Sequence, residues 1–133
     1  KEIFNQMQNQ KSALGLHANI TALIGYIIGI LALVLVFIEK DNKFVRFHAI
    51  QSLLWWIGYW VILFVVCILL AIVGTVLSMI SSTLGGLMWG LIGLLAMIAC
   101  LPLLAGVAYA AYKAYSGEMT KLPIVGNLAD KWA

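Results

Sequence analysis

Charged side chains are scarce in this chain of 133 residues: Asp, Glu, Lys and Arg together make up only 10% of it, whereas hydrophobic residues make up 64%. Soluble domains are typically about 25% charged. No Asp, Glu, Lys or Arg occurs in residues 12–38 or in residues 47–112. A membrane-spanning helix needs about 20 mostly apolar residues. The composition therefore excludes an ordinary soluble domain and predicts an all-α integral membrane protein.

Residue combinations typical of enzymes and metal sites are also missing. No Ser/His/Asp set, paired carboxylates, Cys-x-x-Cys spacing, phosphate-binding loop or nucleic-acid motif is visible. The two cysteines, Cys67 and Cys100, fall near the middle of expected helices, where a buried thiol is usually inert packing. We therefore predict a protein that is not an enzyme, with no catalytic residue, no metal, no cofactor and no nucleic-acid partner.

His17 and His48 are the candidates for a haem or pigment ligand. They flank the first apolar stretch and lie 31 positions apart, and the residues between them are expected to be mostly helical. A helix of this length would hold them about one bilayer thickness apart, so they should not share a metal. Each is interpreted as a hydrogen-bonding residue at the membrane interface, and a pigment- or haem-binding subunit is kept as an alternative.

The second apolar stretch is too long for a single crossing. Its 66 residues would reach about 100 Å as one helix, some three bilayer cores. Gly, Ser and Thr cluster within 74–86, which is typical of a loop, and a turn at Ser81–Gly86 divides the stretch. We predict one membrane domain over 1–133 with three membrane helices, and four as the alternative. The expected helices are about 21–38, 47–79 and 87–115, flanked by amphipathic segments at 1–20 and 116–133.

The distribution of Lys and Arg predicts an orientation, because these residues collect on the cytoplasmic side of a membrane. With three helices, residues 39–48 and the C-terminus share one side and carry six Lys and Arg residues, against two on the N-terminal side. We expect the 39–48 loop and the C-terminus to be cytoplasmic, in a bacterial inner membrane, with the N-terminus outside. Aromatic residues at matching depths indicate that the last two helices pair antiparallel: Trp55, Trp56, Tyr59 and Trp60 with Tyr109, Tyr112 and Tyr115.

Small residues recur at intervals of four in the apolar stretches, a spacing that lets helices approach closely in lipid. Such a stripe serves packing within the chain or contacts with another membrane protein, including a second copy. Both uses stay open at this stage. The residues concerned are Gly25, Gly29, Gly86, Gly90, Gly106, Ala110 and Ala114.

Both ends of the chain are amphipathic. Near the N-terminus Ile3, Phe4, Met7 and Leu14 share one helical face. The C-terminal segment is expected to form a short helix on the cytoplasmic membrane surface, with Pro123 in its first turn. Its apolar face is expected to consist of Ile124, Val125, Leu128 and Trp132.

Two segments carry a family resemblance. The run EKDNKFVRFHAIQSLLWW and, about sixty residues later, AYKAYSGEMTKLPIVGNLADK resemble a family of small bacterial membrane proteins of unknown function. That family is similar to the Tic-twenty subunit of the chloroplast inner-envelope translocon, and magnetosome-membrane proteins of the same kind resemble it too. The resemblance implies an all-helical membrane fold without enzymatic activity, with both segments on the cytoplasmic side. The chloroplast relatives have an additional N-terminal helix, which the polar residues 1–20 do not supply.

The first of these segments is interpreted as the start of a helix. Phe44 and Phe47 are expected to face lipid or the C-terminal segment, and Arg46 and His48 to bond lipid headgroup phosphates or that segment. Gln51, one turn after Phe47, is expected to bond another helix, and Arg46 to anchor the topology. We predict that this motif docks on the C-terminal segment around Lys121 and Pro123.

These features together predict a non-enzymatic accessory or assembly subunit. It would bind other membrane proteins, or itself, through its helix faces and contact lipid headgroups at its charged end. A component of a protein translocation or transport channel is an alternative, although such a path requires polar groups facing inward from several helices. The pigment- or haem-binding subunit is the third interpretation.

Overall fold

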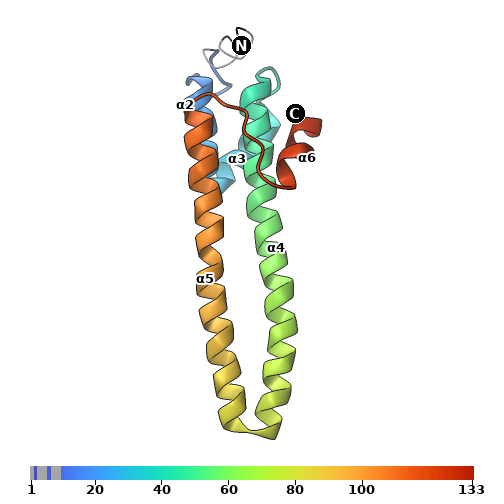
Figure 1. Ribbon diagram of the computed structural model, residues 1–133. Helices are drawn as coiled ribbons and strands as arrows, with labels where there is room; N and C mark the ends of the chain where they lie inside the picture. Colours follow the sequence, from blue (N-terminus) through green and yellow to red (C-terminus); the bar gives the residue numbers. More distant parts are fainter. Residues whose placement is uncertain (1, 3–5, 7–9) are drawn as a thin grey trace. The chain divides into compact units, whose positions relative to one another are not determined.

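The computed structural model describes Glu2, Gln6 and residues 10–133, and over these residues the secondary structure consists of helices without a strand (Figure 1). Two helices, α4 (Lys43–Ile80) and α5 (Ser82–Tyr115), are long and apolar enough to cross a membrane. Three shorter helices are α2 (Ala18–Ile27), α3 (Gly29–Ile38) and α6 (Val125–Trp132). The chain forms two compact units, Lys1–Trp56 with Ala105–Ala133, and Ile57–Leu104. The apolar helical face predicted near the N-terminus includes Ile3, Phe4 and Met7, which lie outside the described residues.

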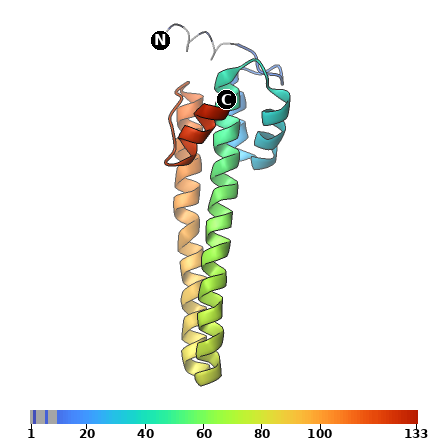
Figure 2. The ribbon, with the colours of Figure 1, turned by 90° about the vertical axis from the view of Figure 1, so that its right-hand side faces the viewer.

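The first apolar stretch is broken in its middle. Ile28 adopts an extended conformation with φ −111° and ψ 93°, and it separates α2 from α3, which have ten residues each. A ten-residue helix rises about 15 Å, half of a bilayer core of about 30 Å. The two helices pack on each other as a hairpin (Figure 2). The single span expected over 21–38 is therefore not supported, and neither is a protein with three spans.

Side chains of α4 satisfy the backbone at this break. The last carbonyls of a helix lack partners within the helix, and leaving them unpaired away from water is costly. Ser52 Oγ donates to the Gly25 carbonyl at 3.0 Å, and Trp56 Nε1 donates to the Tyr26 carbonyl at 3.4 Å. The hairpin is thus stabilised by α4, which explains how an apolar run without proline can be interrupted.

The hairpin also changes which segments share one end of the first unit. Asn19 Nδ2 in the first turn of α2 donates to the Tyr115 carbonyl at the end of α5, at 3.2 Å. The Ala13 amide donates to Glu39 Oε2 in the α3–α4 loop at 2.7 Å. The residues before α2 therefore lie with the α3–α4 loop and the end of α5. The expectation that the first stretch separates His17 from His48 is wrong, because the chain reverses at Ile28.

The second unit is an antiparallel pair of helices. Ser81 alone joins α4 to α5, so the turn is much shorter than the expected Ser81–Gly86. A Cβ at Gly85 would lie only 2.7 Å from the Ser78 Cα, so the glycine permits this tight approach. Further along, Tyr59 Oη donates to the Ala99 carbonyl. The predicted antiparallel pairing is confirmed, while α4 and α5 extend beyond the expected 47–79 and 87–115.

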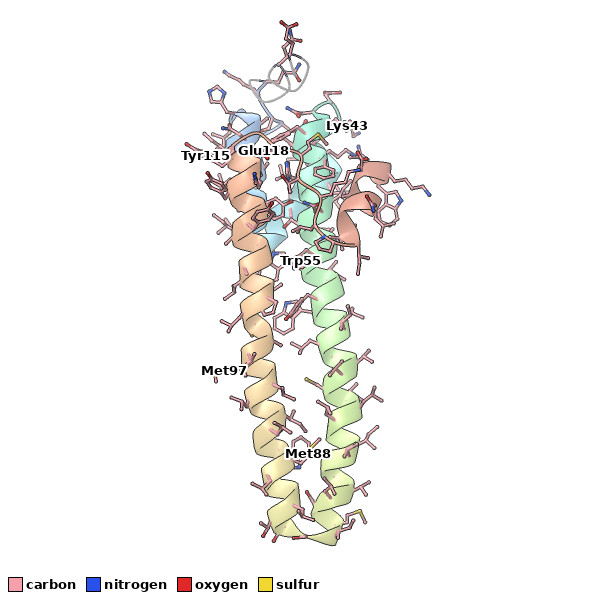
Figure 3. All side chains as sticks on the ribbon, in the orientation of Figure 1. Lys43, Trp55, Met88, Met97, Tyr115 and Glu118 are labelled. Atoms are coloured by element: carbon pink, nitrogen blue, oxygen red, sulfur yellow. The ribbon has the colours of Figure 1, made fainter. Side chains whose placement is uncertain are left out.

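The core of the first unit depends on small residues. Ala110 and Ala114 of α5 are buried in one cluster with Ala18 and Ala22 of α2. A Cβ at Gly106 would overlap the indole of Trp55, which reaches from α4 to α5 (Figure 3). The expected small-residue face of α5 is therefore used for packing within the chain at these positions.

We expect Ala110→Leu to destabilise the isolated protein. Ala110 is 1% exposed, and inserting a larger side chain into a packed core typically costs about 1–3 kcal/mol. Ala108→Leu is the matched control, since Ala108 is exposed on the same helix. Thermal unfolding in detergent should show a lower midpoint for Ala110→Leu alone. Equal midpoints for both variants would contradict this packing.

Candidate functional site

The first turn of α4 is capped by residues of the preceding loop. Asn42 Oδ1 accepts hydrogen bonds from the amides of Phe44 at 3.1 Å and Val45 at 3.3 Å. An Asn in this position satisfies amide groups that a helix start leaves unpaired. The Asn42 amide in turn donates to Glu39 Oε1 at 3.2 Å. The sequence motif is thus a helix start, as predicted, and its helical spacing directs Phe44, His48 and Gln51 to one side of α4.

His48 is buried with both ring nitrogens bonded. Nε2 lies 3.1 Å from the Glu118 carbonyl, and Nδ1 lies 3.1 Å from Tyr26 Oη. A carbonyl oxygen only accepts, so Nε2 carries the proton, and Nδ1 accepts from the Tyr26 hydroxyl. Phe44 and Phe47 meet the imidazole edge-on, with ring centroids 4.6 and 5.0 Å away. The imidazole is held in one orientation and one tautomer.

Gln51 completes this network with three bonds. Its Nε2 donates to Tyr26 Oη at 2.7 Å and to the Thr120 carbonyl at 3.0 Å, and its Oε1 accepts from the Leu122 amide at 3.0 Å. Tyr26 and Gln51 are fully buried. Unpaired buried polar groups are costly, whereas a fully bonded network is rigid and specifies one arrangement. Tyr26, His48 and Gln51 therefore tie α2, α4 and the C-terminal segment together.

The C-terminal segment reaches this network through the turn that ends α5. Gly117 has φ 81°, a conformation that favours glycine, and its amide donates to the Ala114 carbonyl at 3.0 Å. The Glu118 amide donates to the Lys113 carbonyl at 2.9 Å, which completes a Schellman motif. An ion pair of 2.9 Å between Lys113 and Glu118 spans the same turn. Glu118, Thr120 and Leu122 then present alternate backbone groups to His48 and Gln51.

A strained turn connects this segment to α6. Ile124 has φ 68° and ψ −60°, a rare conformation for a β-branched residue, and the Val125 amide donates to the Pro123 carbonyl at 2.7 Å. Pro123 therefore lies before α6 rather than in its first turn. Gly126 follows, and a Cβ there would come within 2.8 Å of Gln51 Oε1. Only glycine allows α6 to approach Gln51 this closely.

Small residues of α6 pack on the rest of the first unit. Gly126 and Ala129 are buried, and Ala129 packs with Phe47 and Ile50 of α4. At the protein surface, Lys121 in the segment before α6 forms an ion pair of 2.8 Å with Asp130 of α6. The lysine holds the pKa of the Asp130 carboxyl below its ordinary value. The apolar residues predicted to share one side are exposed, except for the half-buried Val125: Ile124 just before the helix, and Leu128 and Trp132 within it.

The structure brings the two sequence motifs together but leaves Arg46 out of the network. His48 and Gln51 bond backbone groups of Glu118, Thr120 and Leu122, next to Lys121 and Pro123. Phe44 shares an apolar cluster with Leu122, and Phe47 shares one with Ala129. Arg46 takes no part in these hydrogen bonds of His48 and Gln51. Its Nε is buried and without a partner among the described residues.

Tyr26 is the network residue that the sequence analysis missed. It lies inside the first apolar stretch, where a tyrosine resembles an ordinary packing aromatic, and its hydroxyl was the only local signal. The seven small residues divide into two groups. Five pack against other parts of the chain, whereas Gly86 and Gly90 have open space around them.

These features define a class: a small all-helical protein with two helices long and apolar enough to cross a membrane, a broken helical hairpin, and a C-terminal segment held by buried polar side chains. Within this class, the chain belongs to the magnetosome magnetite crystal formation protein family, whose model matches residues 8–129.

Two archaeal relatives are similar over most of their length. A UPF0132 membrane protein of Methanocaldococcus jannaschii is 35% identical over 124 residues, covering 92% of this chain and 94% of the relative. A UPF0132 membrane protein of Archaeoglobus fulgidus is 33% identical over 114 residues, covering 85% of this chain and 92% of the relative. No solved structure matches. The magnetosome resemblance is thereby confirmed. A relation to the Tic-twenty family is not shown, and these relatives are archaeal rather than bacterial.

Proposed function

We propose that this protein is a non-enzymatic integral membrane protein that acts as an accessory or assembly subunit through helix–helix contacts. Two long apolar helices and relatives named as membrane proteins support the membrane location. The observation that supports the assembly role is an open face of α5 made of Gly86, Gly90 and Gly93. A Cβ at any of these three positions would meet no atom within 4 Å.

Glycines at such spacing let the backbones of two membrane helices approach closely. The other small residues of the predicted stripes already serve packing within the chain: Gly25 faces Leu35, Gly29 faces Trp56, and Gly106 faces Trp55. The Gly86–Gly93 face is therefore where we place a partner helix, from another membrane protein or a second copy.

The alternative functions receive less support from the geometry. A transport path requires polar groups that remain available to water or to a substrate, whereas the polar side chains of Tyr26, His48 and Gln51 bond one another and the backbone. A haem or pigment ligand requires a free ring nitrogen, and both nitrogens of His48 are bonded. His17 is exposed before α2 and would act alone.

The family name refers to magnetite crystal formation in magnetosomes. Among the residues that the structure describes, no group of three or more His, Cys, Asp and Glu side chains could hold a metal ion. The proposal therefore rests on the glycine face and not on a mineral-binding cluster. Organising other proteins in a membrane is the contribution that this chain's own features support.

The charge distribution supports an orientation with two crossings, by α4 and α5. All eight Lys and Arg residues lie in 1–46 or 113–131, and none lies near the turn at Ser81. The hairpin of α2 and α3 leaves the residues before α2 on the same side as the α3–α4 loop. We place the N-terminal segment, the 39–42 loop and the C-terminus together on the cytoplasmic side.

Gly90→Leu is expected to abolish association without destabilising the isolated protein. The leucine would project from α5 where a partner helix must approach, and its Cβ would meet no described atom within 4 Å. Gly58→Leu is the matched control, because Gly58 of α4 also has open space around it. Affinity purification in mild detergent, with the mass of the complex measured by light scattering, should show loss of the partner or second copy for Gly90→Leu only. Unchanged association would contradict the proposed face.

A further inference from the structure

Arg46 carries a charge that no ion pair among the described residues balances. Its Nε is buried without a hydrogen-bond partner in the described part of the chain, and the ion pairs found there are Lys113–Glu118 and Lys121–Asp130. The Glu39 carboxylate of the preceding loop accepts from the amides of Ala13 and Asn42, and it forms no ion pair with Arg46 in the described part of the chain. A buried guanidinium nitrogen without an acceptor is costly. An anion from outside the chain would supply the missing acceptor.

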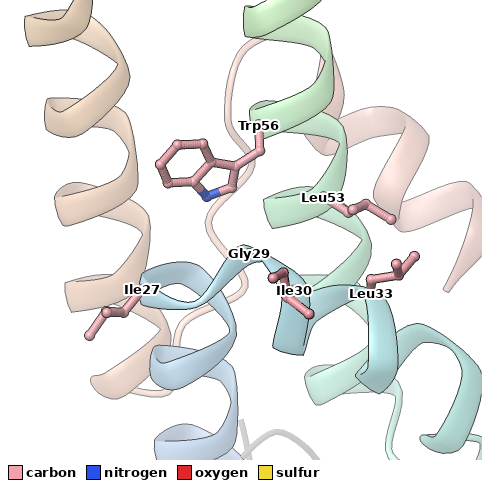
Figure 4. A pocket seen from close by; sticks show the side chains of 6 residues that line it. All are labelled: Ile27, Gly29, Ile30, Leu33, Leu53 and Trp56. Carbon is pink, nitrogen blue, oxygen red and sulfur yellow. The ribbon is translucent and has the colours of Figure 1, made fainter.

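An apolar pocket of about 380 Å³ lies between α3 and α4 (Figure 4). Ile30 and Leu33 line it from α3, and Leu53 and Trp56 from α4, with Ile27 and Gly29 at the break between α2 and α3. The first unit provides the whole lining, and its rim is open. The exposed side chains of Ile27 and Ile30 continue the apolar surface outward. A long, flexible apolar chain fits such a pocket.

The register of α4 relates these two features. Arg46 and Leu53 are seven residues apart, which is about two helical turns or 10 Å along the same side of the helix. Arg46 lies toward the charged start of α4, and Leu53 lies toward its apolar part. A molecule that bonded Arg46 with an anionic group and filled the pocket with a hydrocarbon chain would need both parts of a phospholipid, the phosphate and the acyl chain.

We propose that the α3–α4 face binds one anionic phospholipid, with its phosphate on Arg46 and an acyl chain in the pocket at Leu53. A guanidinium binds phosphate through paired, charge-assisted hydrogen bonds. The guanidinium charge of Arg46, which no ion pair among the described residues balances, favours a headgroup with a net negative charge. A partner's carboxylate would satisfy Arg46 but would leave the pocket unfilled. The inference rests on the proposed membrane location, and it is independent of the Gly86–Gly93 face.

The test is native mass spectrometry of the full chain in detergent, titrated with dioleoylphosphatidylglycerol or dioleoylphosphatidylcholine. We expect one tightly bound phosphatidylglycerol and weaker phosphatidylcholine binding. Arg46→Gln should weaken phosphatidylglycerol binding about tenfold, the usual effect of losing a charge-assisted bond. Lys131→Gln, at an exposed lysine of α6, should leave it unchanged. Equal binding of the two lipids, or an unchanged affinity in Arg46→Gln, would overturn the phosphate site.

A second variant tests the acyl chain independently of Arg46. Gly29→Val would place methyl groups in the pocket, while a Cβ there makes only ordinary contact with Trp56 at 3.6 Å. We expect weaker phosphatidylglycerol binding by a variant whose helical circular dichroism at the binding temperature equals that of the unchanged chain. Unchanged lipid affinity, or complete displacement of the lipid by inorganic phosphate, would overturn the proposed acyl-chain site. Arg46 would then belong to a site for phosphate alone. The result for Gly90→Leu does not bear on lipid binding. The proposed partner face on α5 and the proposed lipid site can therefore be contradicted separately.

Discussion

Replacing Gln51 with leucine is expected to release the C-terminal segment from α4. The leucine has a similar length but removes the acceptor for the Leu122 amide and the donor for the Thr120 carbonyl and Tyr26 hydroxyl. Each buried polar group left unpaired costs about 1–3 kcal/mol. The Leu122 amide and the Thr120 carbonyl would lose their partner, whereas the Tyr26 hydroxyl keeps its bond to His48. Two such losses should reach several kcal/mol, a large fraction of the stability of a small protein. This is the largest change in stability that we expect from a single substitution in the site.

Limited trypsin digestion measures this release directly. Lys121 lies in the bonded segment, so in the native protein its backbone is held by Gln51 on either side, at Thr120 and Leu122. In Gln51→Leu, cleavage after Lys121 should become much faster, and the thermal midpoint in detergent should fall. Ser52→Ala is the matched control, because Ser52 bonds the Gly25 carbonyl of α2 and not the C-terminal segment. Equal cleavage rates in both variants would show that apolar contacts alone hold the segment.

The contacts between α4 and the C-terminal segment could be predicted because the sequence concentrates its polar groups there. Phe44–Gln51 follows a charged loop and precedes a long apolar run, so its polar side chains have few places to find partners. His48 and Gln51 therefore had to bond another segment, and the polar segment around Lys121 follows the last apolar run. The exact acceptors are backbone groups, which carry no residue signature. They became visible only with the structure.

The break at Ile28 could not be predicted from its own residues. Leu23–Ile38 contains no proline and no charge, and a continuous apolar run of this length is typical of one membrane helix. What stabilises the interruption lies elsewhere in the chain, in Ser52 and Trp56, whose side chains bond the carbonyls at the end of α2. The decisive interactions are tertiary, and periodicity within one stretch does not report them. The same limitation concealed Tyr26, whose partners are on α4.

The consequence of that break for membrane topology gives the second large effect. A single helix over 21–38 would place His17 on the opposite side of the membrane from the 39–42 loop. A hairpin of two ten-residue helices returns the chain to the side from which it started, so His17 and the loop lie on the same side. The bonds from Asn19 to Tyr115 and from Ala13 to Glu39 require this arrangement. One cysteine at position 17 therefore distinguishes the two topologies.

We expect an impermeant maleimide on intact cells to label a cysteine at Ser82 and none at His17, Asp41 or Asn127. Each variant carries a single cysteine in a background with Cys67→Ala and Cys100→Ala, and all four positions are exposed in the structure. Permeabilised cells provide the control, since all four variants should then react. Labelling at both 17 and 82 would restore the three-span topology and contradict the hairpin. Labelling at 17, 41 and 127 without 82 would agree with the hairpin but reverse the proposed orientation. The side of the membrane with all eight Lys and Arg residues would then be the outside.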